Sequence, residues 1–128
     1  MHDSTPLISI CMVCYNHEKY VMQAIQSVFD QTYKNWELII VDNASTDRSR
    51  FIIDECIKED SRIVFYPMEI NTYVSYACNF AIKHSSGDYI SALSADDYFE
   101  PEKLEIQIRY MLKNSLSNSF TWVNTVND

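Results

Sequence analysis

The stretch WELIIVDNASTD, residues 36–47, decides the fold. Its first part, WELIIVD, is a short apolar run of the kind that forms a strand buried on both faces of a parallel sheet. The turn NASTD follows at once and is rich in residues that cap the amino ends of helices. Apolar residues then recur at helical spacing, at Ile52, Ile53, Cys56 and Ile57. A strand that leads through a capping turn into an amphipathic helix is the repeating unit of α/β folds.

The same unit recurs on both sides of this stretch. Residues 7–15 form a near-continuous apolar run, and from Glu18 apolar residues repeat at helical spacing, with Asn16 as a candidate cap. Further strands are predicted at residues 62–66, 88–94 and 120–123, and further helices over residues 71–84 and from Pro101 onward. The alternation predicts one α/β domain over residues 1–128, a Rossmann-like three-layer sandwich with a mostly parallel central sheet and helices on both faces.

Composition and charge narrow the classes of function. The chain has 128 residues and 47% hydrophobic content, as expected for one globular domain with a core. Its net charge is −8, and it has no Lys/Arg cluster that could follow a phosphate backbone, so nucleic acid is not expected as a partner. Gly87 is the only glycine of the chain, and a single glycine excludes a P-loop and a GxGxxG dinucleotide motif. Its position is typical of the end of a helix.

Location and redox state follow from what the chain lacks. The polar start MHDSTP has no signal-peptide features, and no apolar run approaches the roughly 20 residues of a membrane span. We therefore expect a cytoplasmic protein, at the inner face of the membrane within a longer enzyme. Cys11 and Cys14 form a CxxC, but residues three apart on a strand point to opposite faces, whereas a redox CxxC normally opens a helix. We expect both thiols to be buried, reduced and without a bound metal.

Polar residues follow three of the predicted strands. They are Tyr15 and Asn16 after the first, Asp42 and Asn43 after the second, and Ser94, Asp96 and Asp97 after the fourth. Open α/β sheets bind ligands beyond the carboxyl ends of their strands, although each cluster also has a simpler interpretation as a cap or a solvated turn. Adjacent carboxylates suit Mg²⁺ or Mn²⁺, which keep positions open for substrate phosphates. A metal held there could neutralise a diphosphate leaving group.

Two longer stretches carry a resemblance to a known family. PLISICMVCYNHEKYVMQAIQSVFDQTYKNWELIIVDNASTD, residues 6–47, resembles the opening of a family 2 glycosyltransferase of the GT-A fold. NTYVSYACNFAIKHSSGDYISALSADD, residues 71–97, resembles the second block of that family, which ends at an acidic metal motif. The similarity runs in the same order and spacing from Pro6 to about Leu104. It implies a GT-A nucleotide-sugar-binding domain.

The resemblance also implies roles for single residues. The nucleotide-sugar site would comprise Tyr15, Asn16, Asp42, Asn79 and Asp96, with Asp96 and Asp97 as metal ligands. Tyr15 would stack on the nucleotide base, and Asp42 would accept a hydrogen bond from the base ring or ribose. Asp96 would contact the ribose or the metal, Asp97 would bind the metal that bridges the diphosphate, and Asn79 would support the site.

The chain departs from the family pattern at four positions. Ser94 stands where the family often has Asp, so the metal site has one carboxylate fewer. Ala44 and Tyr73 stand in place of frequent glycines. Cys78 replaces a common Arg that can help to hold the nucleotide, so the pattern does not identify the donor.

The function implied by the resemblance is inverting transfer of a sugar from a nucleotide-diphosphate sugar to a hydroxyl of a glycan or lipid-linked acceptor, in polysaccharide or glycoconjugate synthesis. Mg²⁺ or Mn²⁺ would be the cofactor. In this family the acceptor pocket and the catalytic base follow the acidic motif, so we expect this chain to be the N-terminal part of a longer enzyme. The surface of this chain that would normally meet the rest of that enzyme favours homo-oligomers.

Two alternatives come from other classes. The first is a nucleotide-sugar-binding module without turnover, which would bind the donor but transfer nothing. The second is a phosphoryl-transfer domain, such as a response-regulator receiver or a haloacid-dehalogenase-like phosphatase. These domains need carboxylates directly after the first strand, where this chain has Cys14, Tyr15 and Asn16, so we give this interpretation little weight.

Overall fold

The computed structural model describes residues 5–58, 60–121 and 123–126. Strands and helices alternate along the chain, as the sequence predicts. The strands are β1 (Ile8–Cys14), β2 (Trp36–Asp42), β3 (Ile63–Pro67) and β4 (Tyr89–Ser94). The helices are α1 (Val21–Phe29), α2 (Ser49–Cys56), α3 (Val74–Lys83) and α4 (Lys103–Lys113).

The four strands form one parallel sheet in the order β3-β2-β1-β4. β1 lies in the interior of the sheet, where Cys14 pairs with Asp42 of β2 and Val13 pairs with Ser94 of β4. Because all strands run in the same direction, their carboxyl ends meet at one edge. This register is what brings the polar residues after β1, β2 and β4 to the same end of the molecule.

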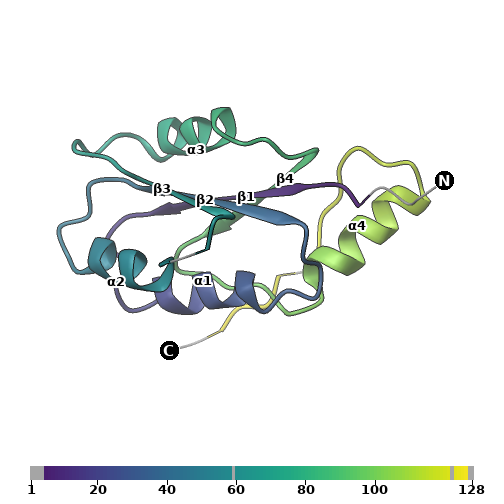
Figure 1. Ribbon diagram of the computed structural model, residues 1–128, viewed down its shortest axis with the longest axis horizontal. Helices are drawn as coiled ribbons and strands as arrows, with labels where there is room; N and C mark the ends of the chain where they lie inside the picture. Colours follow the sequence, from purple (N-terminus) through teal and green to yellow (C-terminus); the bar gives the residue numbers. More distant parts are fainter. Residues whose placement is uncertain (1–4, 59, 122, 127–128) are drawn as a thin grey trace.

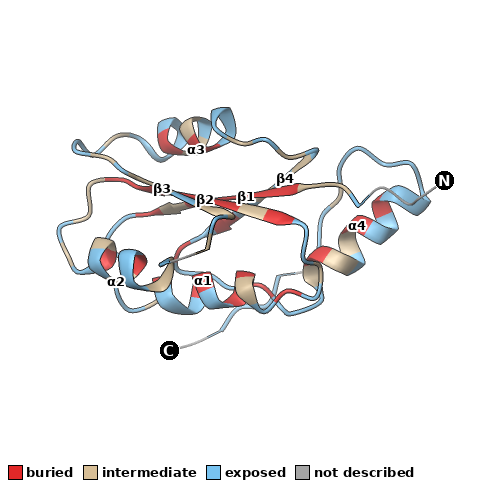
Figure 2. Cartoon of the chain, viewed as in Figure 1, coloured by how far each residue is buried: buried red, intermediate tan, exposed pale blue. Residues whose placement is uncertain are grey.

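Helices cover both faces of the sheet, which confirms the predicted three-layer α/β architecture. Figure 1 shows α3 on one face and α1 and α2 on the other. Helix α1 is amphipathic, and the apolar residues that recur at helical spacing are buried toward the sheet. They are Val21, Ala24, Ile25 and Val28. Figure 2 shows buried residues along the strands and on the sheet-facing sides of the helices.

Two hydrophobic clusters lie on opposite faces of the sheet. The larger joins β1 and β2 to α1, α2 and α4, and the smaller joins Cys11 and Val41 to Ala77 and Ala81 of α3. Cys14 belongs to the larger cluster, so the two cysteines of the CxxC point to opposite faces, as predicted. Burial is the main cause that raises the pKa of Cys11 and of Cys14 to about 11, so both thiols stay protonated near neutral pH.

Three local expectations differ from the structure. The predicted strand at 120–123 is wrong for residues 120, 121 and 123, which form no regular element, and residue 122 lies outside the described part. Asn16 does not cap α1, whose N-cap is Tyr20 without a side-chain cap hydrogen bond. Helix α3 ends before its C-cap His84, so Gly87 lies outside the helix terminus.

Gly87 is required by close approach to β1. A Cβ at this position would lie 2.7 Å from Ser9 N and 2.8 Å from Leu7 O, both on rigid backbone, and would also clash with Ser9 Oγ. The Gly87 N–H donates to Ser9 Oγ at 2.7 Å, and Ser9 Oγ in turn donates to Glu37 Oε2 at 2.5 Å. The single glycine therefore allows the chain to lie close against β1 just before β4 begins.

None of the described helices combines the length and the apolar character that crossing a bilayer demands.

Candidate functional site

The carboxyl edge of the sheet gathers the ends of β1, β2 and β4. Backbone hydrogen bonds continue past the strands, from Asn43 N to Cys14 O at 2.8 Å and from Ala95 N to Val13 O at 3.2 Å. Tyr15 is 42% exposed at this edge. The structure therefore brings the three predicted polar clusters to one side, while their shared cleft stays a prediction.

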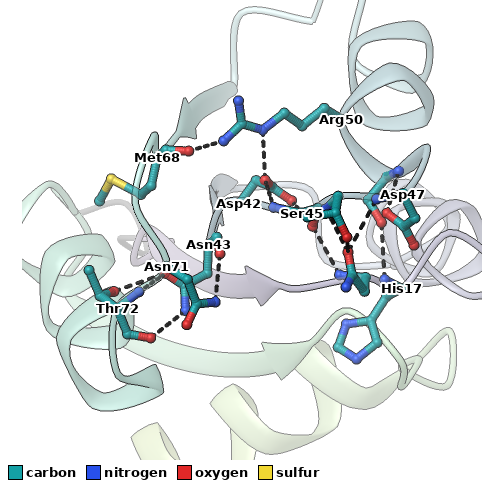
Figure 3. Close-up of polar contacts among 12 residues, drawn as sticks. His17, Asp42, Asn43, Ser45, Asp47, Arg50, Met68, Asn71 and Thr72 are labelled. Atoms are coloured by element: carbon teal, nitrogen blue, oxygen red, sulfur yellow. Dashed lines mark hydrogen bonds and ion pairs between the residues drawn. The ribbon is translucent and has the colours of Figure 1, made fainter.

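The end of β2 is closed by internal contacts. Asp42 is fully buried, and its carboxylate accepts from Ser45 N at 2.9 Å and from Ser45 Oγ at 2.5 Å. Arg50 Nε completes the set with an ion pair to Asp42 Oδ2 at 2.8 Å, and its guanidinium also donates to the Met68 carbonyl (Figure 3). A buried carboxylate is tolerated here because a guanidinium and two hydrogen-bond donors satisfy it.

Asn43 fixes the loop that follows β3. Its Nδ2 donates to Thr72 O at 2.7 Å, and its Oδ1 accepts from Thr72 N and Thr72 Oγ1, both at 2.9 Å. Asn71 Nδ2 donates to Asn43 O at 2.9 Å. A pocket of about 440 Å³ lies beside this contact and is lined by Asn71, Thr72, Tyr73 and Tyr76. Asn43 thereby joins the end of β2 to one wall of a pocket.

Asn16 links the end of β1 to the loop before α2. It has φ 54°, a left-handed conformation that Asn tolerates better than most residues. Its Oδ1 accepts from Thr46 N at 2.8 Å and from Asp47 N at 3.3 Å, and its own N–H donates to Ser45 Oγ at 2.9 Å. Asn16 therefore shapes the loop of residues 45–47 instead of capping α1.

The end of β4 is open. Asp96 and Asp97 are both exposed, in the turn directly after the strand. Ser94 Oγ donates to Asp96 Oδ1 at 2.6 Å, and His17 Nε2 lies 3.8 Å from Asp96 Oδ2. These carboxylates remain accessible, in contrast to that of Asp42.

Asn79 lies apart from these contacts. It is exposed on α3, and among the described residues no hydrogen bond joins it to the strand ends. A larger pocket, of about 880 Å³, lies at a different place, between β4 and α4, and is lined by residues such as Tyr89, Ile108 and Met111. It contains none of the predicted site residues.

Three residues of this edge escaped the sequence interpretation, namely His17, Arg50 and Thr72. Arg50 and Thr72 contact residues that are 8 and 29 positions away in the chain, and no local pattern indicates such partners. His17 could have been found, because it directly follows Tyr15 and Asn16 at a strand end.

The donor set at the end of β4 fits a hard divalent cation in part. Asp96 and Asp97 offer exposed carboxylate oxygens, which Mg²⁺ and Mn²⁺ accept while they keep other positions for water and phosphate. In the described part of the chain, no group of three or more His, Cys, Asp or Glu side chains is placed to hold a metal ion. Water and substrate phosphates would complete such a site.

Comparisons with known proteins agree with this architecture. In S. aureus TarS in complex with UDP-GlcNAc, the matching region covers 84% of this chain and 32% of that chain, with a TM-score of 0.79 and 23% identity. The mannosyltransferase PcManGT from Pyrobaculum calidifontis, in complex with GDP-Man and Mn²⁺, matches 84% of this chain and 33% of that chain, with a TM-score of 0.78 and 18% identity. At these identities the likeness shows the fold alone, and it confirms the predicted GT-A architecture.

The sequence comparisons are more specific. The Escherichia coli protein named UDP-Glc:alpha-D-GlcNAc-diphosphoundecaprenol beta-1,3-glucosyltransferase WfgD is 43% identical over 111 residues, which are 87% of this chain and 43% of that protein. The chain spans less than half the length of the curated relatives that it matches. The family model described as glycosyl transferase family 2 matches residues 9–128. The chain therefore belongs to glycosyl transferase family 2.

Proposed function

We propose that this chain binds the nucleotide-diphosphate sugar of an inverting glycosyltransferase, which transfers the sugar to a hydroxyl of a glycan or lipid-linked acceptor. The observation that carries the proposal is the exposed pair Asp96 and Asp97 at the carboxyl edge of a parallel sheet, in a chain of family 2. Exposed carboxylates at this edge are placed to meet a ligand, because bound ligands lie beyond the carboxyl ends of parallel strands.

The residues of this edge divide the work of holding the donor. Tyr15 presents an exposed ring on which the nucleotide base can stack. Asp96 accepts hydrogen bonds from the ribose hydroxyls, and Asp97 with Asp96 would hold Mg²⁺ or Mn²⁺. When bound, the cation supplies positive charge that stabilises the departing diphosphate. The complexes of TarS with UDP-GlcNAc and of PcManGT with GDP-Man and Mn²⁺ support a donor of this class.

Asp42 takes an indirect part in this proposal. A direct hydrogen bond to the base or ribose would require it to give up Ser45 or Arg50, and its carboxylate is fully buried. We assign Asp42 the task of fixing Ser45 and Arg50, which in turn shape the loops on either side of the donor. Asn79, exposed on α3, supports the site only from a distance.

The acceptor side of the reaction involves groups outside this set. A general base must take the proton of the acceptor hydroxyl as the new bond forms at the anomeric carbon. No residue described above is assigned as this base. The relatives that the chain matches are about twice as long, which leaves room in a protein of that size for an acceptor region. We place the complete enzyme at the cytoplasmic face of a membrane.

Binding calorimetry tests the proposal on this chain without requiring turnover. Uridine and guanosine diphosphates are titrated into the protein with and without Mn²⁺ or Mg²⁺. We expect the metal to strengthen binding, and Asp97→Asn to reduce that gain by about tenfold, the loss that follows from a charged contact of roughly 1.4 kcal/mol. Asp54→Asn removes the same charge from an exposed position on α2 and should leave binding unchanged.

Two outcomes contradict the proposal. One is that neither nucleoside diphosphate binds under any condition. The other is an affinity that does not depend on metal and is the same in Asp97→Asn, which would make Asp96 and Asp97 a solvated turn before α4. An assay of sugar transfer and donor hydrolysis on the longer enzyme, kept separate from the binding measurement, distinguishes a transferase from a binding module.

A further inference from the structure

Strand β4 lies at one end of the sheet. In the order β3-β2-β1-β4 it pairs with β1, and no strand in the described part of the chain lies along its other edge. A free strand edge presents unpaired N–H and C=O groups and readily accepts a further extended segment. The opposite edge is less receptive, because β3 begins just after Asp60 and Arg62 and ends at Pro67. The sheet is therefore most easily extended beside β4.

A groove lies beside this strand. It has a volume of about 880 Å³ and is bounded by residues 88–91, by α4 and by residues 115–119, which follow α4. Apolar side chains that line it, among them Ile90, Leu112 and Leu116, are exposed to solvent. We call this feature the β4 groove. It offers apolar surface next to a free strand edge.

The chain leaves the β4 groove as an extended segment without a partner strand. Gln107 Nε2 of α4 donates to Ser119 O at 3.2 Å and to Ser119 Oγ at 2.9 Å, which fixes the start of this segment against α4. Beyond it, residues 120, 121 and 123–126 form no regular element, and Figure 1 shows the yellow trace running away from α4. Phe120 and Val123 are 96% and 86% exposed. Large apolar side chains that are this exposed indicate an interaction site.

The segment and the groove are nearly free of charge in a strongly acidic chain. The net charge is −8, yet no charged residue occurs between Lys113 and Asp128. Of the residues that line the groove, only Asp88 is charged, and its Oδ2 accepts from Leu7 N at 2.9 Å. Two copies of an acidic chain repel each other and meet most easily where charge is absent. The segment of one copy is therefore electrostatically compatible with the groove of another.

The surface area of the chain leaves room for such a contact. Its accessible surface is 8495 Å², roughly 1,400 Å² more than a folded monomer of 15.0 kDa is expected to expose. The extended C-terminal segment contributes to this excess. A stable interface of ordinary size removes about 800 Å² from each partner. The excess is therefore large enough for one interface per copy.

We propose that two copies of this chain form a dimer in which residues 120–126 of each copy lie extended in the β4 groove of the other. A segment of this length spans roughly 20 Å when extended, enough to run along residues 88–91. Ser119 is held against α4, so a return into the same copy's groove would need a reversal within the next one or two residues. Reciprocal exchange also gives a closed twofold arrangement. The inference goes beyond the proposed function and does not depend on it, because the groove contains none of the predicted site residues.

Sedimentation equilibrium over a wide range of concentrations tests the dimer. The double variant Phe120→Ser with Val123→Ser removes apolar side chains from the segment, and Ile90→Lys places a charge in the groove. We expect each change to weaken dimerisation by at least about 10-fold, because every dimer contains the contact twice. Added NaCl should strengthen the dimer of the unchanged chain, since it screens the repulsion between acidic copies.

Matched variants and a peptide identify the partners of the contact. Val74→Ser and Ile82→Lys make the same kinds of change at exposed positions on α3 and should leave dimerisation unchanged. Thermal unfolding of the dilute protein should be the same in all variants, because every substituted side chain is exposed. A fluorescent peptide of residues 116–126 should bind to the double variant, whose groove is free, and not to Ile90→Lys.

Four outcomes overturn the inference. The first is a chain that stays monomeric and a peptide that does not bind. The second is a monomeric chain whose double variant binds the peptide, which would place the segment in the groove of its own copy. The third is a dimer that Ile90→Lys weakens and the double variant does not, which would mean that the β4 edges pair directly. The fourth is a dimer that neither change weakens, which would lie on another surface.

Discussion

The ends of β2 and β4 begin from the same kind of sequence and reach opposite states. Each is an apolar strand followed at once by acidic or amide side chains. After β2, Asp42 and Asn43 are 0% and 2% exposed, and their polar atoms are taken up by Ser45, Arg50 and Thr72. After β4, Asp96 and Asp97 are exposed. One strand end has become part of the scaffold, and the other remains available to a ligand.

The difference comes from what the following chain brings back to each strand end. Helix α2, which follows β2, places Arg50 beside the Asp42 carboxylate. The loop after β3 places Thr72 beside the Asn43 amide, so both side chains have partners within the fold. The residues after β4 lead to α4, which packs with Leu104 and Ile108 toward the larger cluster, and no described Lys or Arg side chain forms an ion pair with Asp96 or Asp97. A carboxylate at a strand end is therefore not by itself a ligand site.

The largest effect should come from breaking the closed end. Arg50→Met keeps the length of the side chain but leaves the Asp42 carboxylate buried without its cation. We expect a loss of about 2–3 kcal/mol in the free energy of unfolding, below the usual cost of breaking a buried pair because the Arg50 side chain is 36% exposed and partly screened. Urea denaturation measures this loss.

Arg48→Met is the matched control for that variant. Arg48 is exposed and lies over the ring of Phe51, so its loss should change stability by no more than about 0.5 kcal/mol. If Arg50→Met were as mild as Arg48→Met, the end of β2 would not be held by its ion pair, and the contrast with β4 would lose its physical basis.

A second change tests the same contrast within β4, because the residues before this strand pack closely against β1 and the residues after it are exposed. Gly87→Ala places a Cβ less than 3 Å from the backbone of Leu7 and Ser9. We expect a loss of about 1–3 kcal/mol, the usual cost of overpacking, visible as a lower urea midpoint. Ser86→Ala, one residue earlier and exposed, should be nearly neutral. A neutral Gly87→Ala would mean that β4 can move away from β1.

A third change should stabilise the turn after β2. Ala44 has φ 64°, where a Cβ is strained and glycine is not. Ala44→Gly should raise the free energy of unfolding by about 0.5–1 kcal/mol, since the relief of strain exceeds the added freedom of the unfolded chain. Thermal unfolding followed by circular dichroism measures the change. A loss of stability instead would show that the methyl group contributes packing to the closed end.

The smallest effect should come from the open end. Asp97→Asn should change the free energy of unfolding by less than about 0.5 kcal/mol, because the carboxylate is exposed and repels its neighbour Asp96. The same urea experiment compares it directly with Arg50→Met. A large loss of stability in Asp97→Asn would mean that this turn, like the end of β2, is part of the scaffold.

The sequence predicted the elements of this fold better than the state of its site. Strands and helices follow from local apolar spacing, and the predicted order and three-layer arrangement are confirmed. The exception is the strand predicted at 120–123, because residues 120, 121 and 123 form no regular element. The burial of Asp42 depends on Arg50, a partner that no local pattern reveals. The sequence placed Gly87 at a helix end, whereas the structure requires a glycine there because the backbone of Leu7 and Ser9, about eighty residues earlier, lies so close.

The strand order also governs the order in which the protein can fold. β1 is an interior strand, yet one of its two neighbours is β4, which pairs Tyr89 with Ile8 and therefore arrives only after most of the chain has been made. Contacts so distant in sequence form late and slow folding. Until then the apolar strand ISICMVC presents an unpaired edge, a form of β-structure prone to aggregation. We therefore expect a chain that is cut before residue 89 to aggregate more readily than one that extends through α4.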